Sequence, residues 1–77
     1  MAATLHDSIV EVVEGYLGPA AQRFVDRQIK FHLHKPPQEI TGADLAQLTE
    51  WMRISMALLT DNRQLIDECL QRLVQLV

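Results

Sequence analysis

The chain has 77 residues, of which 48% are apolar and 22% charged, and its formal net charge is −3 at pH 7. A chain of this length forms one small domain, residues 1–77, and its apolar share is too high for intrinsic disorder. The acidic balance disfavours a dedicated nucleic-acid binder, because such domains need a basic surplus to neutralise phosphates. No apolar run approaches the roughly 18–20 residues of a membrane span, and no basic region precedes the first apolar stretch, so we expect a cytoplasmic protein.

Helical periodicity runs along the whole chain, and the strict alternation that is typical of half-buried strands is missing. The pattern predicts an all-α fold, a compact four-helix domain with helices at about 4–17, 19–33, 42–59 and 61–77. Short loops join these helices, except for a corner at 34–40 that is rich in histidine and proline. Helices joined by short loops pack as antiparallel or steeply crossed neighbours.

The first helix has recognisable start and stop signals. Thr4 and Asp7 fit a capping box, in which each side chain binds the backbone N–H of the other residue. Gly18 is expected to end the helix, because glycine adopts a positive φ without a Cβ penalty. Pro19 follows, and proline is favoured at the first position of a helix. We therefore expect a tight corner between the first and second helices.

The second predicted helix carries basic residues along one side. This basic stripe consists of Arg23, Arg27, Lys30, His34 and Lys35. Two interpretations stay open: a solvated helix face, or a surface that docks on an acidic protein, a phosphate-bearing partner or anionic lipid. Asp26 lies four residues before Lys30, which predicts an ordinary helical ion pair. The first-helix acids Asp7, Glu11 and Glu14 are candidates to answer the stripe, within the domain or from a second copy.

The third and fourth predicted helices are apolar over more than a third of their circumference. Thr41 and Asp44 repeat the cap pattern ahead of the third helix, and the turn at 60–62 precedes the fourth. A stripe this wide is typical of a helix that is covered on two sides. The apolar surplus belongs to the domain core, to a face that binds a partner, or to a surface that packs on another part of a longer protein. The residues expected on such a partner face are Trp51, Met52, Leu73, Leu76 and Val77.

The polar residues show no pattern typical of an active site. His32 and His34 lie about 200° apart on a helix, so they cannot share one metal ion, and zinc needs three or four ligands. The single cysteine, Cys69, falls in an apolar helical stripe and is expected to be a buried small hydrophobe. Ser8 and Ser55 lie inside helices, without the glycine elbow that exposes a nucleophile. We therefore expect no catalysis, no cofactor, no metal and no small-molecule substrate.

These features favour a non-catalytic protein–protein interaction or regulatory adaptor module that self-associates through the third and fourth helices. The alternative is an anion-binding adaptor that uses the basic stripe to contact a membrane surface or nucleic acid. Residues 17–29, LGPAAQRFVDRQI, resemble small helical modules attached to bacterial signalling and regulatory proteins. The likeness consists mostly of a helix start, and it assigns no functional residue.

Overall fold

The computed structural model describes residues 4–76, and over that range it contains helices and turns but no strand. The all-α prediction is therefore confirmed. The α-helices are α1 (Leu5–Leu17), α2 (Ala21–Gln28), α3 (Gly42–Leu59) and α4 (Arg63–Val74). The remaining helical turns are a 3₁₀ turn at Gly18–Ala20, a π-helical turn at Ile29–Leu33 and a 3₁₀ turn at Pro37–Glu39. We refer to Ile29–Leu33 as the π-turn.

The prediction of a four-helix domain is correct only in part, because the described chain has three long helices. α1, α3 and α4 have 13, 18 and 12 residues, whereas α2 has only 8. The predicted helix at 19–33 is instead a composite, in which α2 lies between the first 3₁₀ turn and the π-turn. Its start is displaced because Gly18 has φ 68° and Pro19 lies in the 3₁₀ turn. Its end is reached at His34, which has left-handed backbone angles of φ 54° and ψ 38°.

Side-chain caps fix where three of the helices begin. The Thr4 hydroxyl accepts from the Asp7 N–H at 3.1 Å, and the Asp7 carboxylate accepts from the Thr4 N–H at 3.3 Å, which confirms the capping box. The Asp44 carboxylate accepts from the Thr41 N–H at 3.0 Å at the start of α3. Asn62 accepts from the Leu65 N–H at 3.1 Å and caps α4, as the predicted turn at 60–62 requires.

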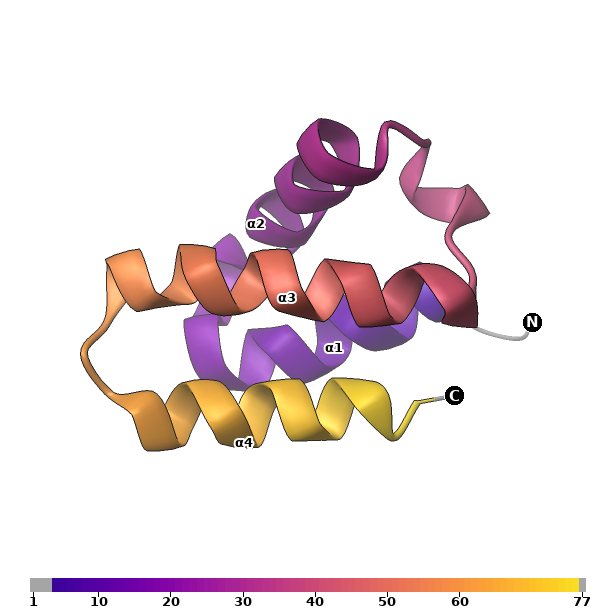
Figure 1. The fold of residues 1–77 in the computed structure, drawn as a ribbon. Coiled ribbons are helices and arrows are strands. Elements are labelled where there is room, and N and C mark those ends of the chain that lie inside the picture. The colour runs from indigo at the N-terminus through magenta and orange to yellow at the C-terminus, as the bar shows by residue number, and fades with distance from the viewer. Residues whose placement is uncertain (1–3, 77) are drawn as a thin grey trace.

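The helices pack around one core. In Figure 1, α3 and α4 run antiparallel side by side, α1 lies behind them, and α2 crosses α3 steeply before the chain returns to the start of α3. The core takes residues from all four α-helices and the π-turn. Its fully buried large side chains are Ile9, Val13, Val25, Ile29, Leu48, Met52, Met56, Cys69 and Leu73. This confirms Cys69 as a buried residue. None of the helices within 4–76 combines the length and the apolar character that crossing a bilayer requires.

The predicted partner face does not form a single surface. Met52 and Leu73 are both 0% exposed, because α3 and α4 turn these side chains into the core. The prediction that they are available to a partner is therefore wrong for this fold. Leu76 packs half-buried against the core, and Trp51 remains 37% exposed. Val77 lies outside the described residues.

Candidate functional site

An apolar stripe runs along the outer side of α3. It consists of Trp51, Ile54 and Leu58, which are 37%, 56% and 85% exposed, and we call it the α3 stripe. Steps of three and four residues align side chains along one side of a helix. Met52 and Met56, which face the core, are both 0% exposed. α3 therefore has two separate apolar sides, one turned into the domain and one turned to solvent.

Trp51 is held in place by a histidine from the π-turn. The His32 and Trp51 rings stack with their centroids 4.0 Å apart and their planes 6° from parallel. Next to this stack, the Ser55 hydroxyl donates to the Gln28 side-chain carbonyl at 3.0 Å and ties the end of α2 to α3. An aromatic side chain with a fixed rotamer loses little entropy when a partner covers it, so Trp51 is suited to anchor an interface. The sequence pattern gave no indication of this role for His32.

The α3 stripe can be paired with its own copy about a point midway between Trp51 and Ile54. Gln47, which is exposed, extends it by one turn, so that the spacing from Gln47 through Trp51 and Ile54 to Leu58 is four, three and four residues. In an isologous antiparallel pair each contact occurs twice about the two-fold axis, so residues at equal distances from that axis along the two helices meet. In such a pair Trp51 of one copy meets Ile54 of the other. Leu58 likewise meets Gln47.

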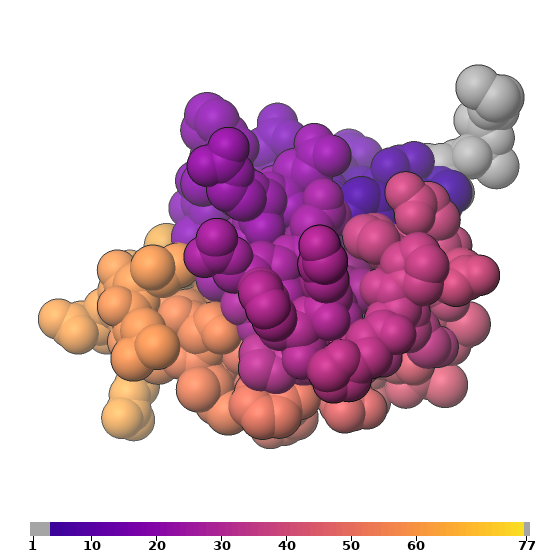
Figure 2. Space-filling view, turned by 90° about the horizontal axis from the view of Figure 1, so that it is seen from above, coloured from indigo at the N-terminus to yellow at the C-terminus, as the bar shows by residue number. Residues whose placement is uncertain are grey.

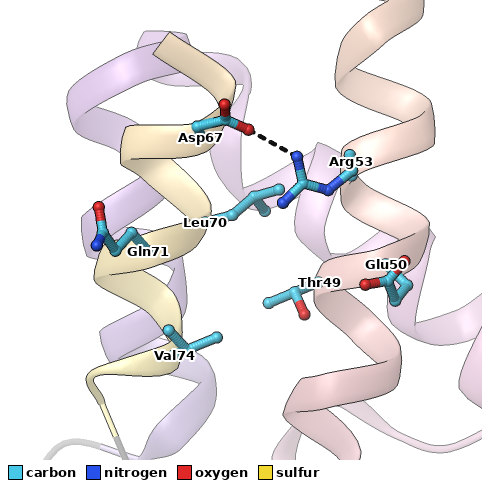
Figure 3. A pocket seen from close by; sticks show the side chains of 7 residues that line it. All are labelled: Thr49, Glu50, Arg53, Asp67, Leu70, Gln71 and Val74. Atoms are coloured by element: carbon cyan, nitrogen blue, oxygen red, sulfur yellow. Dashed lines mark hydrogen bonds and ion pairs between the residues drawn. The ribbon is translucent and has the colours of Figure 1, made fainter. Parts of the chain in front are cut away.

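A second concave surface lies between α3 and α4. Figure 3 shows Leu70 and Val74 pointing from α4 toward Thr49 on α3, with the Arg53–Asp67 ion pair above them at 2.6 Å. The hollow has a volume of about 370 Å³. Both charged side chains are more than half exposed, and ion pairs of that kind add only about 0–1 kcal/mol to stability. The two converging charged groups in this hollow, Arg53 and Asp67, are paired with each other, and we assign the hollow no role.

The residues of the basic stripe have different environments in the folded chain. Arg23, Arg27 and Lys30 are exposed, and none makes an ion pair among the described residues. The predicted Asp26–Lys30 pair is wrong, because an Asp26 carboxylate oxygen instead lies 2.5 Å from Nε2 of the buried His6. This contact joins α2 to α1, and no local pattern in the sequence predicts it.

The end of the basic stripe is tied to α3. Lys35 donates to the Asp44 carboxylate at 2.6 Å. This hydrogen bond lowers the pKa of the Asp44 carboxyl, and the Thr41 N–H lowers it further. Lys35 thereby fixes the corner segment at the start of α3. His34 is exposed and has the left-handed backbone that ends the π-turn.

The acids of α1 do not neutralise the basic stripe within the domain. Asp7, Glu11 and Glu14 are exposed. Among residues 4–76, the only ion-pair contact of these acids lies between Asp7 and Nδ1 of His6, at 3.7 Å. Ion pairing of these acids with the basic stripe within one chain is therefore excluded for the described residues. Ion pairing with the basic stripe of a second copy stays a prediction.

The remaining candidate groups do not assemble into a site. Within residues 4–76, no three histidine, cysteine, aspartate or glutamate side chains lie close enough to hold one metal ion. Burial raises the pKa of the Cys69 thiol to about 11, so the reactive thiolate is disfavoured. Ser8 is half-buried on α1, and Ser55 is engaged with Gln28.

Comparison with known proteins finds no family model, no curated protein and no solved structure that matches the chain.

Proposed function

We propose that the chain is a non-catalytic interaction module that self-associates by pairing the α3 stripes of two copies. The observation that carries the proposal is the alignment of Trp51, Ile54 and Leu58 on one solvent-facing side of a helix whose other side is fully buried. Aligned exposed apolar residues mark interaction surfaces, whereas singly scattered ones are ordinary. This proposal moves the interface from the predicted face on α3 and α4 to the outer side of α3 alone.

The domain does not need the α3 stripe to complete its core. Leu48, Met52 and Met56 already fill the inner side of α3 at 0% exposure. Among the described residues, no buried side-chain nitrogen or oxygen lacks a hydrogen-bond partner. The α3 stripe is therefore apolar surface that the core does not bury, which supports a role in association.

A second copy is the occupant that best fits this surface. The four-three-four spacing from Gln47 to Leu58 suits a two-fold antiparallel pair, in which Ile54 of one copy packs on Trp51 of the other. In that pairing Glu50 comes opposite Ser55 of the partner copy, so no like charges meet at the edge of the stripe. The chain also carries both an acidic α1 surface and a basic α2 surface, which favours attraction between copies.

The expected affinity is low. Burying a fully exposed large apolar side chain contributes about 1.5–3 kcal/mol, and the stripe residues are already partly covered. Association costs at least about 4 kcal/mol of translational and rotational freedom. Even at the favourable end of these values, the balance corresponds to a dissociation constant no tighter than roughly 10 µM, and intermediate values lie in the millimolar range. We therefore expect a reversible dimer whose population depends on protein concentration.

Sedimentation equilibrium from about 10 µM to 1 mM tests the proposal, because this range extends from the tightest expected dissociation constant to the millimolar range. The native chain should pass from monomer to dimer, and Ile54→Lys should remain monomeric at all concentrations. Val74→Lys is the matched control, since Val74 is also apolar and 49% exposed but lies on α4. It should dimerise like the native chain. A native monomer at about 1 mM, or an Ile54→Lys variant that still dimerises, would refute the proposal.

A further inference from the structure

An open pocket lies where the π-turn meets the proline corner. Its volume is about 620 Å³, and it is lined by Asp26, Lys30, His34, Lys35, Pro36 and Pro37. We call it the corner pocket. Figure 2 views the molecule from the side of α2, where α2, the π-turn and the corner segment form one continuous face. The volume is within the range of about 300–1,000 Å³ that is usual for sites that hold small molecules.

The charges at the corner pocket leave a free cation. Lys35 is committed to Asp44 at 2.6 Å, and the Asp26 carboxylate is shared with His6. Lys30 makes no ion pair within the described residues. The ring of His34, which also lines the pocket, can add an N–H donor. An anionic group that enters the pocket therefore meets an ammonium that makes no ion pair among the described residues.

The backbone determines what else the pocket can offer. Pro36 and Pro37 form its wall, and neither has a backbone N–H to donate to a ligand. Recognition must come from side-chain charge and from apolar contact with the proline rings. The left-handed turn at His34, a conformation that is uncommon outside glycine, brings these rings next to Lys30. A strained turn and a π-turn together are features that often mark binding sites.

We propose that the corner pocket binds a small organic anion, with one carboxylate or phosphate group attached to a flat apolar body. The acidic group pairs with Lys30 and accepts from His34, and the flat body lies on the rings of Pro36 and Pro37. A polyanionic surface fits less well, because Asp26 lines the same pocket and the chain carries a net charge of −3. This site is separate from the α3 stripe and does not depend on dimerisation.

Titration of the ¹⁵N-labelled chain with phenyl phosphate and with benzoate, followed by NMR, tests the site. Both probes should shift the amide signals of Lys30, His34 and Lys35. Inorganic phosphate lacks the apolar body and phenol lacks the charge, so each should bind at least about tenfold more weakly. Equal affinity for phenyl phosphate and inorganic phosphate would overturn the proposal. So would the absence of shifts with both organic anions.

Two variants and one control locate the binding group. Lys30→Gln should weaken phenyl phosphate binding about tenfold, because it removes a charge-assisted hydrogen bond. His34→Asn should weaken it less, and asparagine tolerates the left-handed backbone that this position requires. Arg27→Gln is the matched control, since Arg27 is an exposed cation near the end of α2, three residues before Lys30, but does not line the pocket. An equal loss for Arg27→Gln and Lys30→Gln would overturn the proposal in favour of a diffuse basic field. The same titration of Ile54→Lys should be unchanged, which separates this site from the dimer.

Discussion

Two leucines on one helix provide a direct test of the packing. Leu48 and Leu58 both lie on α3, and their side chains are identical, but Leu48 is 0% exposed and Leu58 is 85% exposed. Truncating each to alanine removes the same atoms from opposite environments. The pair therefore separates the effect of burial from any effect on the intrinsic helix propensity of α3.

The expected losses in free energy of unfolding differ several-fold between the two variants. Leu48→Ala should lower the free energy of unfolding by about 2.7–5.0 kcal/mol, because it removes buried methyl groups and leaves a cavity among tightly packed neighbours. Leu58→Ala should change it by less than about 0.5 kcal/mol in the monomer, as exposed substitutions usually do. A domain of this size has a total stability of roughly 4–12 kcal/mol. Leu48→Ala therefore removes a large part of this stability. If the native stability lies at the lower end of the range, the variant is unfolded.

Urea denaturation followed by circular dichroism measures both values. The experiment should use about 0.5 µM protein, roughly twentyfold below the tightest dissociation constant expected for the dimer, so that the monomer dominates. Equal slopes in urea are needed for the two midpoints to be compared directly. If Leu58→Ala costs as much as Leu48→Ala, the outer side of α3 is buried in the monomer, and the reasoning behind the α3 stripe fails. If Leu48→Ala is neutral, the assignment of the core is wrong.

Two further predictions concern backbone strain and burial. Gly18→Ala should destabilise the domain by about 1 kcal/mol or more, because φ at Gly18 is 68°. Gly15→Ala should stabilise it by about 0.5–1 kcal/mol, because Gly15 is helical and nothing lies within 4 Å of an added Cβ. If both variants shift the urea midpoint in the same direction, this pair of predictions is wrong. Since burial raises the pKa of Cys69 from 9.0 to about 11, the unfolded thiol ionises first, so stability should fall as pH rises through that interval. Cys69→Ala should remove this fall, and the native thiol should react with iodoacetamide far more slowly in buffer than in urea.

The features that were predicted well from the sequence depend on residues that lie close together in the chain. The Thr4–Asp7 capping box and the Asn62 cap each involve residues three apart, so the chain around them is enough to specify the contact. The buried position of Cys69 followed from helical periodicity for the same reason. None of these features needs knowledge of how the helices are arranged.

Contacts between distant segments could not be predicted in this way. The local rule paired Asp26 with Lys30, a contact worth only about 0.2–0.5 kcal/mol on a helix surface. In the folded chain Asp26 instead contacts His6, twenty residues away, because α1 and α2 pack together. The π-turn escaped prediction too, since the apolar spacing through Ile29 and Leu33 is compatible with an uninterrupted α-helix. The cavity of the corner pocket depends on that turn and could not be predicted, although Lys30, His34 and Lys35, which line it, belong to the predicted basic stripe.

The sequence and the structure place the candidate interface on different residues. Trp51 and Met52 were assigned to one face because both are large and apolar. Adjacent helical residues point about 100° apart, however, and in the structure Met52 is buried while Trp51 lies on the outer side. A stricter use of periodicity separates them: Met52 belongs with Leu48 and Met56, and Trp51 belongs with Ile54.

The apolar surplus of this short chain is therefore confined more narrowly than its composition indicates. Most of the large apolar side chains are consumed by the core, and the exposed ones outside the α3 stripe lie apart on other segments or at a helix end. These are Phe31, Leu59 and Val74. Isolated exposed residues of this kind are normal for a soluble surface. Within the described part of the chain, only Trp51, Ile54 and Leu58 are aligned, and only Trp51 is braced by a second ring, His32. Alignment and bracing, rather than total hydrophobicity, are the physical reasons to expect that this side of α3 meets another molecule.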